Sequence, residues 1–219
     1  YIPRELGKSV VNSITTEVRF LTNYSILKTK QTLAAGVRVA YSKFHRQGGG
    51  EGTTGFDYNF TLVSSQFEYD LIFTTLNVAP YFENTFRIGN NFSITPGVRF
   101  EYLNSKASGY KIKDDVQLNT NDSRNRYIPL AGIGLEYKVA RTTNVYANFS
   151  QAYKPFDYSD LTPFGVTSKI DPNMKDAYGW NADLGYRGTI KNILNFDLGG
   201  FCMQYNKRIG IVLKTDAVT

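Results

Sequence analysis

Side chains that commonly carry out chemistry are scarce in this chain, which has one histidine, His45, and one cysteine, Cys202. A single cysteine forms no internal disulfide and no thiolate zinc site, and a lone histidine gives little basis for a Ser-His-Asp triad. His45 is interpreted as a surface residue beside a loop, and Cys202 as a small hydrophobic side chain. The glycine run 48–52 lacks the Lys-Ser/Thr ending of a phosphate-binding loop. We therefore predict no catalytic residue, no metal site and no cofactor.

Two carboxylates, Asp171 and Asp176, flank an expected turn and have the oxygen chemistry of a calcium ligand. A general loop role is the favoured interpretation for both. The formal net charge of +6 is spread along the chain, and no basic cluster is interleaved with aromatic residues on one face. Binding to nucleic acid is therefore not expected.

Much of the chain consists of segments that alternate strictly between two kinds of side chain. In residues 178–188, aromatic and aliphatic side chains occupy one parity and polar or very small ones the other: Tyr178, Trp180, Ala182, Leu184 and Tyr186 against Asn181, Asp183, Gly185 and Arg187. Successive side chains of a β-strand leave opposite faces, so a period of two predicts a strand.

Eight segments follow this pattern, and aromatic residues, which favour strands, make up 15% of the chain. The expected strands are residues 13–24, 31–44, 77–86, 92–102, 126–138, 144–155, 178–188 and 194–202. Short turns are expected at 25–29, 88–91, 141–144 and 189–192, and long polar loops at 45–65, 106–125 and 155–177. Short turns at one end and long loops at the other are typical of an up-and-down transmembrane β-barrel.

The apolar parity begins and ends in aromatic residues, which distinguishes a membrane barrel from a soluble one. Expected near the short turns are Phe20, Tyr24, Phe86, Phe92 and Tyr137, and near the long loops Tyr41, Phe44, Tyr102, Tyr153, Tyr178 and Trp180. Two such girdles suit the two membrane–water interfaces. On the other parity, opposite charges such as Glu17 and Arg19 can pair in a watery lumen.

Several blocks of sequence resemble the C-terminal barrel of TonB-dependent outer-membrane receptors. They are YANFSQAYKP at 146–155, DPNMK at 171–175, DLGYRG at 183–188 and ITPGVRFEY at 94–102. Within that family, RQGGG at 46–50, NVAPYFE at 77–83 and PLAGIGLEY at 129–137 are similar to the ferric dicitrate transporter branch. MKDA at 174–177 departs from the family's usual Leu-Lys-Pro-Glu, a segment that sets loop geometry.

The resemblance implies an all-β, antiparallel barrel of roughly 22 strands, of which residues 1–219 would form part of one domain of about eight strands. It also implies a protein of the bacterial outer membrane, in contact with its lipid. The transported ligand would be an iron chelate such as ferric citrate or another siderophore. Transport would be driven by an inner-membrane energy-coupling complex acting through a plug domain. The chain starts at Tyr1 and is expected to be a segment without that plug.

Ferric citrate is a compact anion, so its site needs cations and hydrogen-bond donors near the extracellular mouth, where arginine can grip a carboxylate with two donors. The candidates by position are Arg46, Gln47, Arg124, Arg126 and Lys154. For each one, the simpler interpretation is a solvated loop or lumen charge. Arg99 is expected to pair with Glu83 or Glu101, and Arg187 with Asp183, which would stiffen the wall.

Two other classes of function stay open at this point. A passive porin or small structural barrel of eight strands would pair its first strand with its last, whereas a segment would leave both edges open. An outer-membrane lipase or protease would need a Ser-His or Asp-His pair in the lumen or at the mouth. The sequence favours a transporter that performs no chemistry on its cargo.

Overall fold

The computed structural model describes residues 4–26, 28–53, 59–63, 66–113, 115–155, 176–191 and 193–206. These residues form eight β-strands. In chain order the strands are β1 (Arg4–Ile26), β2 (Thr29–Gly52), β3 (Tyr69–Ile88), β4 (Phe92–Lys113), β5 (Val116–Ala140), β6 (Thr143–Lys154), β7 (Ala177–Ile190) and β8 (Leu194–Asn206). The all-β fold class predicted from the alternation is confirmed.

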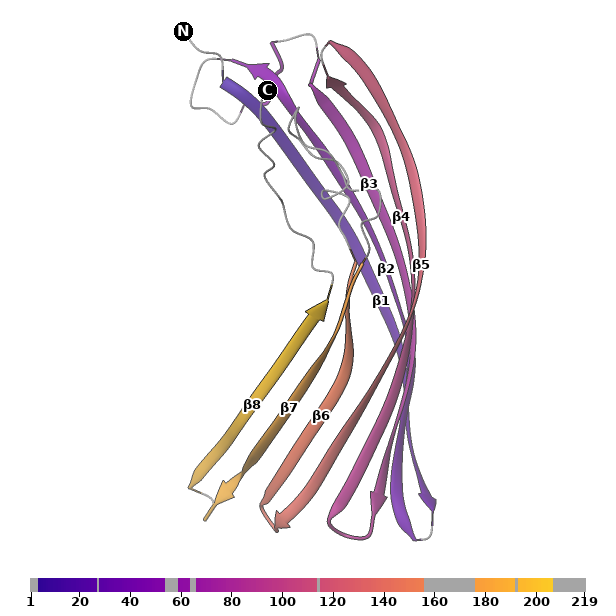
Figure 1. Cartoon of the computed structure of the whole chain (residues 1–219), viewed down its shortest axis with the longest axis vertical. Helices are drawn as coiled ribbons and strands as arrows, with labels where there is room; N and C mark the ends of the chain where they lie inside the picture. The colour runs from indigo at the N-terminus through magenta and orange to yellow at the C-terminus, as the bar shows by residue number, and fades with distance from the viewer. Residues whose placement is uncertain are drawn as a thin grey trace, which may run out of the picture. The chain divides into compact units, whose positions relative to one another are not determined.

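The strands form one antiparallel meander in which each strand is bonded to its neighbours in the chain, in the order β1 to β8 (Figure 1). Within the described residues β1 pairs with β2 alone and β8 with β7 alone, so the sheet has two open edges. The alternative of a closed barrel of eight strands required pairing between β1 and β8. The topology instead agrees with a segment of a larger barrel.

The chain divides into two compact units, which are described separately below. Unit 1 contains residues 1–21, 34–82 and 99–129, and unit 2 contains residues 22–33, 83–98 and 130–219. Strands β1 to β5 pass through both units, whereas β6 to β8 belong to unit 2. The assignment of residues 1–219 to one barrel domain stays a prediction.

The expected short turns are all present where the structure describes them, and we call that end of the strands the turn end. Strands β3 and β4 are joined at residues 89–91, where Gly89 has a φ of +62°, and β5 and β6 at residues 141–142. The opposite end of each strand is called the loop end. At the loop end β1 to β5 extend well beyond the segments predicted from the alternation, whereas β6 and β7 end within one residue of the prediction.

The largest correction concerns residues 106–125, which were expected to form a long loop. Strand β4 continues to Lys113 and β5 begins at Val116, so this segment is a hairpin with a tight turn. Asp115 adopts a φ of +61°, a left-handed conformation that Asp tolerates in turns better than most residues. Likewise, β2 extends to Gly52, which shortens the loop expected at 45–65. Of the loop expected at 155–177, residues 156–175 lie outside the described part.

The registers of β5 to β8 confirm the two predicted faces in unit 2. Ala182 pairs with Cys202 and Tyr186 with Leu198 on the apolar face, while Arg187 pairs with Asp197 on the polar face. Because side chains alternate, the apolar and polar residues of neighbouring strands stand over each other in register. Apolar side chains such as Leu184 and Leu198 are nevertheless 59% and 69% exposed. An exposed apolar band of this kind is the surface that a barrel presents to lipid.

Side-chain contacts assign the same two faces in unit 1. Asn77 of β3 donates to the Glu101 carboxylate of β4 at 3.4 Å, and these residues are on the polar face. Tyr102 and Tyr127 lie on the apolar face with ring centroids 5.3 Å apart. The Tyr102 hydroxyl donates to Asn125 at 3.0 Å. Each face therefore continues from strand to strand across β3, β4 and β5.

Toward the loop end of unit 1 the alternation inverts its phase. Several positions of the polar-face parity become apolar and buried, at Leu71, Phe73, Leu103, Ala107 and Ile128, although arginines remain on this parity in β2 and β5. The apolar-face parity becomes polar, at His45, Asp70, Asn104, Lys106 and Asn125. An outward apolar face is favourable only against lipid, so the inversion marks where the strands leave the membrane and enter water.

The aromatic girdle at the loop end is present, with one correction. Tyr153 and Tyr178 form an edge-on pair with centroids 5.0 Å apart, and Phe149 stacks on Trp180 at 5.9 Å. Phe44, however, stacks on Phe73 at 5.9 Å and so lies on the polar-face parity. Phe44 is three residues from Tyr41 and so has the opposite parity already in the sequence, and its assignment to the girdle was wrong. Among the described residues, no helix has the length and hydrophobicity needed to span a membrane.

Candidate functional site

Arg46, the first predicted ligand residue, lies near the loop end of β2 in unit 1. It shares its parity with Phe44 and therefore belongs to the polar face. Its guanidinium carbon lies 5.9 Å from the centroid of the Tyr69 ring on β3, within the range of a cation–π contact. The same ring covers Gly48, where an added Cβ would meet the ring within hard-sphere contact. Tyr69 therefore supports Arg46 from the neighbouring strand.

Arg124 and Arg126 lie on β5 in the same unit and also belong to the polar face. Their neighbours Asn125 and Tyr127 contact Tyr102 on the apolar face, so the two arginines leave the strand on the opposite side. Arg124 is exposed and Arg126 is half-buried. Three of the predicted candidates therefore belong to one face at the loop end of unit 1.

Gln47 is not brought together with Arg46, because consecutive strand residues face opposite ways. Its amide donates to Asp70 Oδ2 at 2.7 Å. The Nε2 atom of His45 lies 2.7 Å from Asp70 Oδ1, a contact that becomes an ion pair when the imidazole is protonated. Asp70 is the residue of this cluster that sequence reasoning missed. His45 and Gln47 have the same parity, so the sequence already indicated that their side chains lie on one face and could share a partner.

Lys154, the fifth candidate, ends β6 and belongs to unit 2. It pairs with Ala177 in the register of β6 and β7, is exposed, and shares the polar-face parity of Asn148. It therefore has the predicted orientation.

Two titratable groups at the tip of the β4–β5 hairpin, beyond the membrane boundary, are perturbed by their surroundings. Burial raises the pKa of Tyr110, and the negative charge of Asp70 raises it further. Burial lowers the pKa of Lys111 because it disfavours the charged ammonium. Both side chains are half-buried, whereas Val116 and Leu118 on the other strand of the hairpin are 57% and 51% exposed.

A tyrosine laid across a glycine links three strands on the polar face of unit 1. The Tyr81 ring of β3 covers Gly36 of β2, where an added Cβ would lie 2.6 Å from the tyrosine oxygen. The Tyr81 hydroxyl donates to Glu17 on β1 at 2.8 Å and accepts a hydrogen bond from Arg19 at 3.0 Å. We call this three-strand contact a tyrosine brace. Sequence reasoning missed it, although an aromatic residue on the polar parity opposite a glycine was a usable signal.

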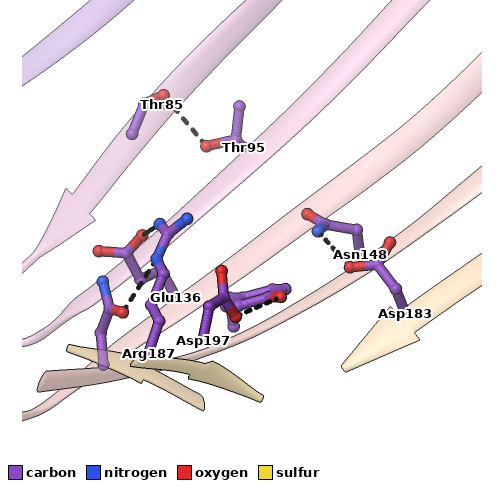
Figure 2. A network of polar contacts seen from close by, with 9 residues as sticks. Thr85, Thr95, Glu136, Asn148, Asp183, Arg187 and Asp197 are labelled. Atoms are coloured by element: carbon purple, nitrogen blue, oxygen red, sulfur yellow. Dashed lines mark hydrogen bonds and ion pairs between the residues drawn. The ribbon is translucent and has the colours of Figure 1, made fainter. Parts of the chain in front are cut away.

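Unit 2 contains a second tyrosine brace. Tyr146 of β6 covers Gly185 of β7, where an added Cβ would lie 2.3 Å from the ring, and its hydroxyl donates to Asp197 of β8 at 3.1 Å. The Arg187 guanidinium carbon stands 5.0 Å from the Tyr146 ring centroid. Figure 2 shows Arg187, Glu136 and Asp197 gathered at this position. The second brace therefore also connects three strands to a carboxylate and an arginine.

The charge pairs were predicted correctly for Arg99 and incorrectly for Arg187. Arg99 pairs with Glu101, its Nε atom 2.8 Å from the carboxylate. Arg187 pairs with Glu136 at 2.9 Å and not with Asp183, which instead accepts from Asn148 at 2.7 Å (Figure 2). Residues four apart on a strand are separated by about 13 Å. Glu136 on β5 and Arg187 on β7 are diagonal to each other across β6, at a shorter separation that lets the two side chains meet.

The two faces at the loop end of unit 1 carry different polar groups. An Asp–His pair does exist in His45 and Asp70, but it lies on the face opposite to Arg46, and both Asp70 oxygens are occupied by His45 and Gln47. No group of three metal-ligating side chains occurs among the described residues. The polar face at the loop end presents Arg46, which lies against the Tyr69 ring, together with Arg124 and Arg126, and guanidinium groups can bind carboxylates with two donors.

Comparison with known proteins agrees with this fold. Residues 7–218 match the model of the family described as TonB dependent receptor-like, beta-barrel. The unliganded ferric citrate transporter FecA is similar, at 20% identity and a TM-score of 0.72 over 92% of this chain and 28% of that one. The ferric-catecholate import receptor Fiu from E. coli K12 has 12% identity and a TM-score of 0.71 over 90% and 32%.

The ferric yersiniabactin uptake receptor FyuA from Yersinia pestis is also similar, at 15% identity and a TM-score of 0.63 over 92% of this chain and 29% of that one. At these identities the similarity establishes the fold alone. The chain spans about a third or less of the length of these structures. The family match covers nearly the whole chain and sets its location in the bacterial outer membrane. The chain therefore belongs to the TonB-dependent receptor family, as part of its outer-membrane β-barrel.

Proposed function

We propose that the intact protein is an energy-coupled outer-membrane receptor that imports an iron chelate, and that ferric citrate is the first cargo to test. The family supports a transporter rather than an enzyme. The similar structures named above are described as handling ferric citrate, ferric catecholate and ferric yersiniabactin. Energy would come from an inner-membrane complex acting through a plug domain, with the barrel held in outer-membrane lipid.

The observation that carries the proposal is the shared orientation of Arg46, Arg124 and Arg126. All three leave their strands on the polar face of unit 1 at the loop end. Arginine offers several planar donors to a carboxylate, and the Tyr69 ring restricts the movement of Arg46. Lys154 has the same parity in unit 2 and is proposed as a further cation. Gln47 would act indirectly, through Asp70.

The decisive experiment is calorimetric titration of the intact receptor in detergent. Iron citrate is compared with iron-free citrate and with an unrelated siderophore, for the parent and for Arg46→Ala combined with Arg126→Ala. We expect tight binding of iron citrate alone, weakened by at least about a hundredfold in the double variant, because two arginines are removed and each lost charge-assisted hydrogen bond contributes roughly 1.5–3 kcal/mol.

The matched control is Arg141→Ala, which removes one arginine from the turn between β5 and β6. It should bind iron citrate like the parent. If the receptor binds another siderophore in preference, ferric citrate is the wrong cargo and the receptor assignment stands. If no iron chelate binds at all, iron import is the wrong function for this barrel.

A further inference from the structure

Two lysines occupy the outward face just beyond the membrane boundary. Lys43 on β2 is two residues from Tyr41 and two from His45, so it shares their face, and Lys106 on β4 shares the face of Tyr102 and Asn104. Both lysines are exposed. Neither ammonium group has a hydrogen bond or an ion pair with another residue in the described ranges.

The strand registers place these lysines on either side of one residue, Thr74. Tyr69 lies over Gly48 and Tyr81 over Gly36. Gly36 and Gly48 are twelve residues apart on β2, and Tyr69 and Tyr81 are twelve residues apart on β3, so the register of the two strands is unchanged between these contacts. Lys43 is five residues before Gly48 on β2, and Thr74 is five residues after Tyr69 on the antiparallel strand β3. Lys43 is therefore opposite Thr74. We infer from this register that the two lysines belong to one short row.

The register of β3 and β4 completes the row. The Ile112 amide donates to the Glu68 carbonyl at 2.6 Å, and the Gly109 backbone approaches Leu71. Lys106 is six residues before Ile112 on β4, and Thr74 is six residues after Glu68. Lys106 is therefore opposite Thr74 on the side away from β2. With neighbouring strands about 4.8 Å apart, the two lysine backbones are about 10 Å apart. We call Lys43, Thr74 and Lys106 the lysine row.

The surroundings of the lysine row leave its positive charge uncompensated. Asp70 is the nearest carboxylate on the outward face of β3, and its two oxygens are occupied by Gln47 and His45. On the membrane side, Tyr102 bonds to Asn125, and Asn104 donates to the same Asn125 oxygen at 2.6 Å. Tyrosine side chains are enriched at the lipid headgroup level. The row therefore lies where the phosphates of outer-leaflet lipids lie.

We propose that the lysine row is a binding site for the phosphates of an anionic, phosphorylated glycolipid of the outer leaflet. Two ammonium groups on adjacent-but-one strands can each bind a phosphate oxygen, while the lipid chains lie along the apolar band below. The Thr74 side chain between them is placed to add a hydroxyl donor. This surface faces away from Arg46 and Arg126, so it is independent of the proposed cargo site.

The test is binding of diphosphoryl lipid A to the intact receptor in a mild detergent, measured by native mass spectrometry. In Lys43→Gln combined with Lys106→Gln we expect affinity to fall roughly 30-fold, since two lysines near a charged lipid surface are removed. Dephosphorylated lipid A should bind the parent weakly, and its affinity for the lysine-row variant should be nearly the same. Inorganic phosphate should not displace the lipid.

The matched control is Lys30→Gln combined with Lys138→Gln, which removes the same charge from exposed lysines at the turn end. It should bind lipid A like the parent. Heat-modifiable electrophoretic mobility establishes that every variant is folded, and iron citrate binding should be unchanged in the lysine-row variant. Equal lipid A affinity in parent and lysine-row variant overturns the proposal. Displacement of lipid A by inorganic phosphate would assign the site to free phosphate and overturn the lipid assignment.

Discussion

At the scale of single residues, the most informative positions are glycines covered by aromatic rings. Gly185 is buried beneath Tyr146, and Gly36 lies beneath Tyr81. In both cases the absence of a Cβ lets the ring lie flat on the sheet, and the tyrosine hydroxyl reaches a carboxylate on the strand beyond the glycine. The glycines therefore decide where a tyrosine brace can form.

Gly185→Ala tests this dependence. The new Cβ would meet the Tyr146 ring and displace it, and overpacking of this kind costs about 1–3 kcal/mol. We expect a lower unfolding free energy in denaturant titrations of the intact receptor in detergent. Gly200→Ala is the control, because a Cβ there would have no atom within 4 Å. Equal stability of the two variants would contradict the brace.

The candidate site was predictable in part, and the failures are also explained by single residues. The orientation of Arg46, Arg126 and Lys154 follows from strand parity, which the sequence carries. The separation of Gln47 from Arg46 follows from the same parity once β2 is known to continue through both residues. Asp70 could not be predicted, because it lies outside the predicted third strand and bonds to residues more than twenty positions away.

At the scale of strands, the predicted elements are correct in the membrane, and those of β1 to β5 are too short outside it. The alternation of residues 92–102 is clear because lipid on one side requires a uniformly apolar parity. After Tyr102 that requirement ends, and burial moves to the other parity at Leu103 and Ala107. The pattern of apolar residues on one parity therefore ends at Tyr102, although the strand continues. The sequence therefore predicted loops where β4 and β5 continue.

The turn of the β4–β5 hairpin offers a test at this scale. Asp115 has a φ of +61°, which a β-branched residue adopts only at a cost of roughly 1–2 kcal/mol. Asp115→Val should therefore loosen the hairpin tip, whereas Asp115→Gly should preserve it. Amide hydrogen exchange on β4 and β5 in the intact receptor measures the effect, and it should be confined to the loop end. Identical exchange in both variants would show that the turn does not control the hairpin.

At the scale of the whole molecule, the sheet of the described residues has open edges at β1 and β8. Unpaired backbone groups at a sheet edge are costly in lipid, where water cannot satisfy them. The similar structures are about three times longer than this chain, which agrees with a larger barrel in the intact protein. In the intact protein β1 and β8 are therefore expected to have partners.

A chain restricted to these 219 residues provides the matching prediction. Placed in detergent, it should self-associate through β1 and β8, because only pairing satisfies the edge amides. Light scattering coupled to size-exclusion chromatography measures the mass of the species, with the intact receptor as the monomeric reference. A monodisperse monomer with exchange-protected amides on both edge strands would contradict this expectation.

The tyrosine braces also bear on the order in which the sheet is assembled. Tyr81 joins β3 to β1 across β2, and Tyr146 joins β6 to β8 across β7. A newly formed hairpin of two strands cannot complete either contact, since the carboxylate is supplied by the strand beyond it. The tyrosine hydroxyl would stay solvated until the third strand arrives, and only then would the pair become fixed. Sets of three strands, rather than hairpins, are therefore the smallest units in which this wall acquires its rigidity during insertion.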